Sequence, residues 1–414
     1  MLQDPAVCFP LKEECFMTVI SPKSGKTGTD YTELLKAVSL KSREIGLIPL
    51  GFSTADQAPG GEKSFSEHLR NGIPAGVYYL ARNQEVRNNP ALILPDCGII
   101  MSFALPYFQE LPYSEPDSGR ISIYALGRDY HRVLRKKLNI IGSFLKDLIP
   151  EIQTRAITDS APFYEQFFAE ITGSAIRGRN NLVRIKEGGS WIFLGELLTS
   201  LKAEISENSA FNCLPRKNCP PPCPPGCDRC RRCCPGKAFT PEGFKIEKCL
   251  SYLTIENPEE IPDEMIEAVG NRIYGCDECQ LSCPENRRLL RSKKHKSPEL
   301  IPDSDLKNRY SRDFLKLTAL LDLTDEEFLK VFAGSPIHRI GYQAFMRNVF
   351  AASANAPGNP ELLKKLRARI GTVAYPRTLE MAIQAQLRKL GESHHKNYPA
   401  ENNLKLQLPH SERN

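Results

Sequence analysis

Two runs of cysteines carry the clearest chemical signal in the sequence. Residues Cys227–Pro235 contain the pattern CxxCxxxCP, and residues Cys276–Pro284 repeat it. In bacterial proteins with two [4Fe–4S] clusters, such a run holds three corners of one cube, and the cysteine before proline crosses over to the other cube. The repeated pattern therefore predicts two [4Fe–4S] clusters.

The crossover rule distributes the cysteines of this segment into two sets of four. The predicted ligands of the first cluster are Cys223, Cys227, Cys230 and Cys283. The predicted ligands of the second cluster are Cys234, Cys249, Cys276 and Cys279. The first set departs from the usual spacing, because three residues separate Cys223 from Cys227 and Cys233 is a spare thiol beside Cys234. Cys219 or Cys213 is the alternative fourth ligand.

Zinc and disulfides are the other uses that clustered cysteines can have. Paired CxxC motifs also form zinc ribbons, but the two Cys-Pro endings favour iron–sulfur clusters. The N-terminus carries acids where a signal peptide carries basic residues, and no apolar run is long enough to span a membrane. We therefore expect a cytoplasmic protein without a membrane segment, in which thiols stay reduced. Cys8, Cys15 and Cys97 are most simply unliganded, Cys97 as a small apolar residue in a strand.

Charge and composition say less, apart from one basic stretch. The chain has 414 residues, of which 41% are apolar and 25% charged, and a net charge of +6, as expected for a globular protein of two or three domains. The stretch RRLLRSKKHK at 287–296 contains no acid, so it is a candidate contact for a phosphate backbone. Its basic residues are Arg287, Arg288, Arg291, Lys293, Lys294 and Lys296.

Strands and helices alternate in the part of the chain that precedes the cysteines. The periodicity predicts a helix from Tyr31 to Ile45 with a stop at Gly46, and strands in LIPLGFS, CGIIMSFALPY, TRAIT and SWIFLGELLTSL. Between the second and third strands, an amphipathic helix is expected to bury Leu134, Leu138, Ile141, Leu145 and Leu148. Another helix is expected in PFYEQFFAEI. This alternation suggests an α/β layer up to about Leu201.

The composition and periodicity of the sequence change at the cysteines and again after them. Pro, Gly and Cys between Cys213 and Pro235 leave no hydrophobic period, so metal must organise this segment. Thr324 and Glu327 then form a predicted capping box, and helices are expected over 338–354, 360–370 and 377–390. The predicted division is a flexible lead-in at 1–30, an α/β domain at 31–202, a cluster domain at 203–296, a helical-repeat domain at 297–390 and a disordered tail at 391–414.

With these motifs in place, the sequence resembles the epoxyqueuosine reductases. The resemblance rests on YALGRDYH from Tyr124, TDSAP around Asp159, GSAIRGRNNL from Gly173, GSWIFLGELLT from Gly189, AVGNRIYGCDECQLSCPENR from Ala268 and SPIHRIGYQAFMRN from Ser335. It covers about 80% of the chain. Arg179 departs from the pattern, because the family usually has lysine between Gly178 and Asn180.

The resemblance implies both a fold and an activity. It implies a cytoplasmic monomer of mixed α+β and α/β class, with a cobalamin-binding α/β domain, a ferredoxin-like domain with two [4Fe–4S] clusters and a C-terminal, HEAT-like helical domain that helps hold tRNA. The implied reaction reduces epoxyqueuosine to queuosine at the wobble position of tRNA, the last step of queuosine formation. The resemblance also implies that an external low-potential donor feeds the clusters, which are expected to pass electrons to cobalamin.

The same resemblance implies roles for individual residues. Asp159 is the predicted general acid, although an aspartate before a helix is also a natural N-cap. The predicted cofactor contacts are Tyr124, Arg128, Asp129, Tyr130, His131, Gly178, Arg179, Asn180, Ser190 and Trp191. For Tyr124–His131 the alternative is a helix cap with solvated polar residues, and Trp191 could simply belong to the core.

Other functions remain open at this point. Arg339, Arg347 and Asn348 match family positions in the helical domain, where they either contact RNA or cap helices. A corrinoid-dependent reductase of another substrate, such as a reductive dehalogenase, would use the same cofactors. A noncatalytic iron–sulfur protein that transfers electrons or activates a corrinoid would need the clusters, but neither an acid nor an RNA surface.

Overall fold

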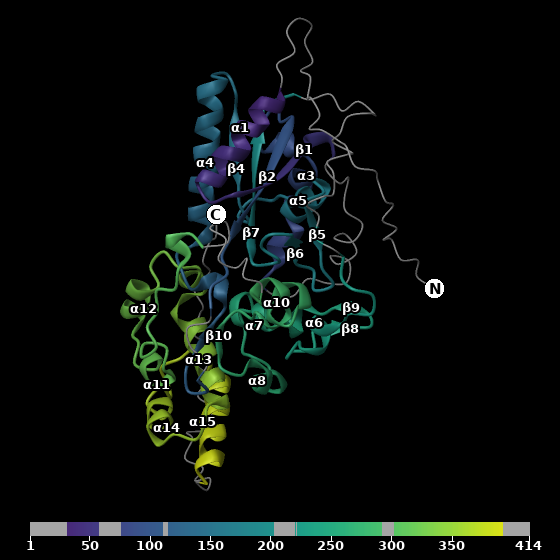
Figure 1. The fold of residues 1–414 in the computed structure, drawn as a ribbon. Coiled ribbons are helices and arrows are strands. Elements are labelled where there is room, and N and C mark those ends of the chain that lie inside the picture. The colour runs from purple at the N-terminus through teal and green to yellow at the C-terminus, as the bar shows by residue number, and fades with distance from the viewer. Residues whose placement is uncertain are drawn as a thin grey trace, which may run out of the picture. The chain divides into compact units, whose positions relative to one another are not determined.

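The computed structural model describes residues 31–57, 76–110, 115–202, 220, 222–291 and 302–391. The chain divides into two compact units (Figure 1). The first comprises Met1–Gly61, Asn83–Pro106 and Leu134–Pro224, and the second comprises Glu62–Arg82, Tyr107–Val133 and Pro225–Asn414. The predicted lead-in at 1–30 lies outside the described residues, as does the predicted tail beyond Gly391. The predicted boundary between a cluster domain and a helical domain, at 296, stays a prediction.

A four-stranded sheet forms the centre of the first unit. Its order is β1-β2-β7-β4, and every neighbouring pair is antiparallel. The strands are β1 (Ile48–Thr54), β2 (Ile99–Pro106), β4 (Thr154–Ile157) and β7 (Ile192–Thr199). All of β2 is buried because the sheet is covered on both faces. The expected strands are confirmed, but their antiparallel order differs from the parallel sheet that alternating strands and helices usually form.

Helices cover the two faces of this sheet. Helix α4 (Tyr130–Leu148) packs against one face, where a Cβ atom on Gly195 would approach side-chain atoms of Leu134 to 2.8 Å. Helix α5 (Glu165–Ile171) packs against β1, β2 and β7. Helix α1 (Tyr31–Glu44) contacts β1, and Gly46 ends its turn with φ at 78°. The other elements are α3 (Gln84–Asn88) and the hairpin β5 (Ala175–Arg177) and β6 (Val183–Ile185).

The amphipathic pattern of α4 predicts its buried face well except at the end. Leu134, Leu138, Ile141 and Leu145 are fully buried, whereas Leu148 is 50% exposed. The prediction that Leu148 is buried is wrong. Leu148 is the last residue of α4, and the helical period does not show where the packing of an apolar face ends.

The second unit has short elements around the cysteines and longer helices after them. A parallel pair joins β3 (Arg120–Ile121) to β10 (Arg272–Tyr274), and a hairpin joins β8 (Phe239–Thr240) to β9 (Gly243–Phe244). The helices are α6 (Arg229–Arg232), α7 (Leu250–Ile255), α8 (Asp263–Val269), α9 (Glu278–Leu281), α10 (Pro284–Arg291), α11 (Leu317–Leu320), α12 (Asp325–Val331), α13 (Gly341–Asn355), α14 (Pro360–Arg367) and α15 (Pro376–Leu390). Among the described residues of both units, 3-10 turns occur at Ala55–Gln57, Tyr78–Ala81, Pro90–Leu92, Ile123–Ala125, Ile246–Lys248, Ser304–Leu306 and Pro336–Ile340.

One hydrophobic core holds the second unit together, and α13 runs through its middle. This helix packs against α15, α8, α7 and β10 (Figure 1). Its residues Phe345 and Val349 share a core cluster with Leu250 and Ile273, which flank the cysteine loops. The predicted capping box at Thr324 and Glu327 is confirmed, as are the three predicted C-terminal helices, with bounds that differ by up to three residues. The helical segment therefore supports the cysteine segment directly.

Candidate metal centre and cofactor site

Three of the four predicted ligands of the second cluster, Cys234, Cys249 and Cys276, lie near one another in the second unit. Cys249 lies within electrostatic reach of both Cys234 and Cys276. The Ala238 amide donates to the Cys234 sulfur at 3.4 Å, and backbone amides after Cys249 and Cys276 donate to their sulfurs. Burial raises the pKa of the Cys276 thiol to about 11. Backbone N–H groups directed at cysteine sulfurs fit an iron–sulfur cluster, whose thiolates accept such hydrogen bonds.

The other predicted ligands, with the exception of Cys223, lie in short helices or directly before them. Cys230 lies in α6 and Cys279 in α9, and these two short helices pack against each other. Cys283 immediately precedes α10. Cys227 comes just before α6 in the second unit, whereas Cys223 lies in the first unit, where its sulfur is 3.8 Å from Arg184 Nη2.

The other cysteines divide between exposed, buried and undescribed positions. Cys233 is exposed, as expected for a spare thiol, and Cys97 is buried just before β2. The ten cysteines of the described segments form no disulfide, and these segments contain no group of three or more His, Cys, Asp or Glu side chains that could hold a single metal ion. Cys8, Cys15, Cys213 and Cys219 lie outside the described residues.

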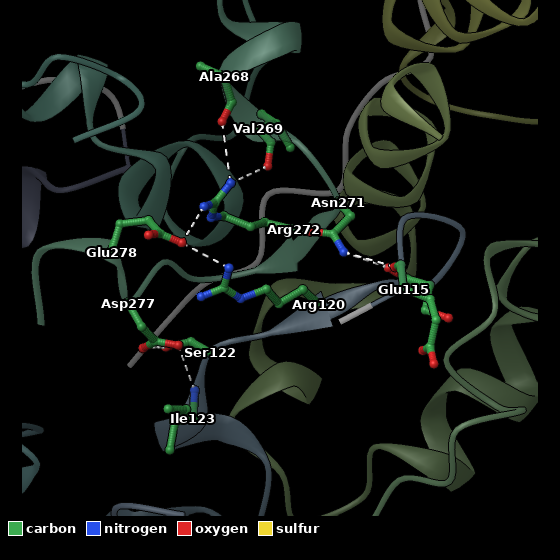
Figure 2. A network of polar contacts seen from close by, with 11 residues as sticks. Glu115, Arg120, Ser122, Ile123, Ala268, Val269, Asn271, Arg272, Asp277 and Glu278 are labelled. Atoms are coloured by element: carbon green, nitrogen blue, oxygen red, sulfur yellow. Dashed lines mark hydrogen bonds and ion pairs between the residues drawn. The ribbon is translucent and has the colours of Figure 1, made fainter. Parts of the chain in front are cut away.

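Two acids lie between Cys276 and Cys279 and bind the chain segment at 120–123 (Figure 2). The Asp277 carboxylate accepts hydrogen bonds from the Ser122 hydroxyl and, at 3.0 Å, from the Ile123 amide. Glu278 Oε1 accepts from Arg120 Nη1 at 2.8 Å and from Arg272 Nη2 at 2.7 Å. Although burial alone would raise the pKa of Glu278, the two guanidinium groups hold it below its ordinary value. Burial raises the pKa of Asp277.

A glycine brings this ligand loop close to the same segment. Gly275 has φ at 72°, and a Cβ atom there would lie 2.6 Å from Ser122 Cβ. Only glycine avoids both the left-handed strain and the contact. The Tyr124 ring lies 6.0 Å from the Tyr274 ring, so the first predicted cofactor contact packs against the strand that leads to Cys276.

The other predicted contacts in Tyr124–His131 form the start of α4. The Tyr130 ring stacks on the His131 ring at 4.0 Å. Asp129 Oδ1 lies 2.7 Å from His131 Nδ1 and accepts from the His131 amide, so Asp129 acts as a helix cap. Although burial acts to raise the pKa of Asp129, His131 holds it below its ordinary value. Arg128 is exposed and pairs with Asp305 at 3.2 Å. The alternative role as a cap therefore holds for Asp129, and the cofactor role stays a prediction.

Asp159 lies in a loop of the first unit that is anchored at both ends. Strand β4 ends at Ile157, and α5 begins only at Glu165 with Tyr164 as its N-cap. Asp159 is therefore not the N-cap of α5, and its side chain is exposed. Next to it, Ser160 Oγ accepts from Arg135 Nη2 at 2.7 Å, while Phe163 is buried against Phe168.

Two further groups of predicted contacts lie in the same unit. Gly178, Arg179 and Asn180 form the turn between β5 and β6, with Arg179 exposed. Ser190 and Trp191 immediately precede β7 and are buried. The N-terminal end of β7 and the C-terminal end of β4 lie at the same end of the sheet because the strands are antiparallel. Topology thus places Asp159, Ser190 and Trp191 toward one end of the sheet.

The residues considered for RNA contact separate into exposed and buried groups. Arg287 and Arg288 are exposed on α10, whereas nothing is described of the side chain of Arg291 or of Lys293, Lys294 and Lys296. Arg339 is exposed and pairs with Glu256 at 2.6 Å. Arg347 and Asn348 are fully buried and donate to backbone carbonyls of Leu253, Asn257, Thr254 and Ile273. These two side chains therefore secure helix and strand ends and are not available to RNA.

Sequence reasoning missed the acids and arginines that surround the cysteine loop. Asp277 and Glu278 stand between two predicted ligands, which was a signal, but their partners in the segment at 120–123 are more than 150 residues away. It also missed Glu196, which is fully buried in β7 directly opposite Ser102. Burial, followed by the charge of Glu165, raises the pKa of Glu196 well above its ordinary value.

Comparison with known proteins agrees with this arrangement. Residues 217–286 match the family model of the 4Fe-4S double cluster binding domain. The cysteine loops thus define the class, a double-cluster iron–sulfur protein, and favour iron over zinc. Residues 87–160 match the model described as epoxyqueuosine reductase QueG, DUF1730.

Similarity to whole proteins narrows the class to one family. The epoxyqueuosine reductase of Vibrio cholerae is 34% identical over 83% of this chain and 89% of its own length. That of Escherichia coli is 32% identical over 83% of this chain and 86% of its own length. The chain belongs to the epoxyqueuosine reductase family.

Solved structures show the same fold. A crystal structure of epoxyqueuosine reductase with a tRNA-Tyr epoxyqueuosine-modified stem loop matches with a TM-score of 0.69 and 26% identity, over 86% of this chain and 90% of that chain. The Bacillus subtilis enzyme, solved with an aspartate-bearing catalytic loop swung out of its active site, matches equally well over the same shares. Among the helices described, none is long and apolar enough to cross a bilayer.

Proposed function

We propose that this protein reduces epoxyqueuosine to queuosine in the anticodon of tRNA. The observation that carries this proposal is the similarity to epoxyqueuosine reductases over 83% of the chain, together with the match of residues 217–286 to the double-cluster domain. The reaction removes the epoxide oxygen as water and consumes two electrons and two protons. Two clusters that each carry one electron can together supply the two electrons, and an external low-potential donor must then reduce the clusters again.

Cobalamin is the cofactor that we propose for the reducing site. The residues of Tyr124–His131 fit the rim of a corrin ring, because Tyr, Asp and His side chains can exchange hydrogen bonds with its amides and the Tyr130–His131 stack offers a flat, half-buried surface. We assign the same role to Gly178, Arg179, Asn180, Ser190 and Trp191. When bound, reduced cobalamin supplies a strongly nucleophilic cobalt, which is the chemistry that opening an epoxide requires.

Asp159 is the residue that we propose as the general acid. As the C–O bond of the epoxide breaks, the oxygen takes the proton of the Asp159 carboxyl group and does not have to develop a full negative charge. An aspartate in water is ionised at neutral pH and has no proton to donate. The exposed loop position allows the bound cofactor and base to cover Asp159, and exclusion of water favours the protonated form of a carboxyl group. The aspartate-bearing catalytic loop of the Bacillus subtilis relative supports this assignment.

The substitution Asp159→Asn tests the assignment because it keeps the size of the side chain and removes the transferable proton. We expect single-turnover conversion of epoxyqueuosine to slow by roughly 10²- to 10⁴-fold, the usual contribution of general acid catalysis. Iron content and tRNA affinity should not change. Asp147→Asn is the matched control, because Asp147 is exposed on α4 in the same unit. Near-normal conversion by Asp159→Asn would falsify the acid role.

The tRNA contacts and the cellular compartment of the protein follow from the proposed substrate. We propose that Arg287, Arg288, Arg291, Lys293, Lys294 and Lys296 contact tRNA phosphates, since the first two are exposed on α10 and the stretch contains no acid. We infer that the protein acts as a monomer in the cytoplasm, where its tRNA substrate and reduced thiols coexist.

A further inference from the structure

The cysteine loop of the second cluster is surrounded by fixed charges that no ligand role explains. Glu278, next to Cys279, binds the guanidinium groups of Arg120 and Arg272 with the same oxygen atom (Figure 2). Side-chain exposure is 17% for Arg120, 10% for Arg272 and 25% for Glu278. Two positive charges share one negative charge, so the ion triad of Arg120, Glu278 and Arg272 carries one excess positive charge.

Both arginines also have N–H groups that make no hydrogen bond within the described part of the chain. Arg120 Nη2 and Arg272 Nε are buried and have no hydrogen-bond partner among the residues that the structure describes. A buried N–H group without an acceptor costs free energy. The charge of Arg272 already acts on the Cys276 sulfur. An anionic cluster, with its sulfides and thiolates, would be both an acceptor and a counter-charge for these groups.

Asp277 is oriented differently from Glu278. Its carboxylate binds the Ser122 hydroxyl and the Ile123 amide, and it is 1% exposed. It therefore holds the ligand loop against the segment that leads to Tyr124. The two acids between Cys276 and Cys279 thus have different roles. Asp277 attaches the ligand loop to the segment at 120–123, and Glu278 binds the two arginines beside the loop.

We propose that the ion triad of Arg120, Glu278 and Arg272 sets the reduction potential of the second cluster. When the cluster takes one electron from a low-potential donor, its negative charge grows by one, and nearby positive charge stabilises the reduced form. The arginines raise the potential and Glu278 limits the rise. The inference rests on the predicted ligands Cys276 and Cys279 but not on the identity of the substrate.

Potentiometric titration followed by electron paramagnetic resonance tests the proposal on the full chain, reconstituted with iron and sulfide and without cobalamin or tRNA. Glu278→Gln should raise the potential of the second cluster, and Arg120→Gln should lower it. We expect each to change the equilibrium constant for reduction by about tenfold, which for a one-electron couple is about 59 mV. The first cluster in the same sample is the internal reference.

Opposite signs distinguish charge from structural damage, because a loosened loop would shift the two variants alike. Arg120→Lys keeps the charge and should leave the potential near that of the unmodified chain even if Arg120→Gln loads iron poorly. Arg377→Gln, which removes an exposed arginine paired with Asp263, should change neither cluster. Equal potentials in all variants, or shifts of one sign, would overturn the proposal. Because neither tRNA nor cobalamin is present, this result leaves the proposed reductase activity untouched.

Discussion

Replacement of Asn348 by alanine tests whether the helical segment supports the cluster loop or contacts RNA. Asn348 is fully buried in α13, and its Nδ2 donates to the carbonyls of Thr254 at 2.7 Å and Ile273 at 3.0 Å. Thr254 lies in α7, and Ile273 lies in β10, three residues before Cys276. The substitution Asn348→Ala therefore removes one hydrogen bond from α13 to α7 and one from α13 to β10, the strand that leads to Cys276.

The structure sets the expected size of the effect. Each buried carbonyl that loses its donor costs about 1–3 kcal/mol, so two carbonyls cost about 2–6 kcal/mol. A folded unit is stable by only about 5–15 kcal/mol in total. For a unit of roughly 150–250 residues, each kcal/mol lowers the Tm by about 2–4 °C. We therefore expect the Tm to fall by at least about 4 °C.

Anaerobic thermal unfolding, followed by circular dichroism and by the visible absorption of the clusters, measures this loss. Gln343→Ala is the matched control, because Gln343 lies on the exposed side of α13 and its side chain accepts from the Ala374 amide at 3.1 Å. It should change the free energy of unfolding by no more than about 0.5 kcal/mol. A Tm within about 1 °C of the unmodified protein would refute the reasoning. Weaker tRNA binding, measured well below the Tm and accompanied by an unchanged Tm, would instead assign Asn348 to RNA.

Two further outcomes are expected from the same site. Gly275→Ala places a Cβ atom 2.6 Å from Ser122 Cβ at a φ of 72°, so iron should fall from about eight per chain toward about four as the second cluster is lost; iron that stays near eight would mean that the loop relaxes without cost. Joint replacement of Arg287 and Arg288 by glutamine should weaken tRNA binding and reduce its dependence on salt, whereas Arg388→Gln, on an exposed part of α15, should not. An unchanged salt slope would assign α10 to ordinary solvated surface.

Local patterns in the sequence were sufficient for the chemistry and for most elements. Iron–sulfur ligation depends on thiols at short, regular separations, so the two CxxCxxxCP runs predict the clusters before any fold is known. The four leucine and isoleucine positions from Leu134 to Leu145 predict the buried face of α4 because helical geometry repeats every 3.6 residues. The capping box of Thr324 and Glu327 is equally local, since both partners lie within one turn.

Interactions between distant segments could not be predicted in this way. Arg347 and Asn348 carry the same side chains whether they bind RNA or backbone carbonyls, and only the packing of α13 against α7 and β10 decides between them. The antiparallel order of β1, β2, β7 and β4 likewise depends on which strands meet, and a strand pattern does not specify its partner.

The sequence by itself thus determined that this protein holds two clusters and which cysteines are candidates for them. Tertiary structure alone decided what surrounds those cysteines, because the partners of Asp277 and Glu278 in the segment at 120–123 come from a part of the chain more than 150 residues away. It also decided that Asp159 is exposed in a loop and is not a helix cap. The ligands of a cluster can be predicted from cysteines at short separations in the sequence. The charge and the exposure around the cluster depend on distant chain segments that only folding brings together.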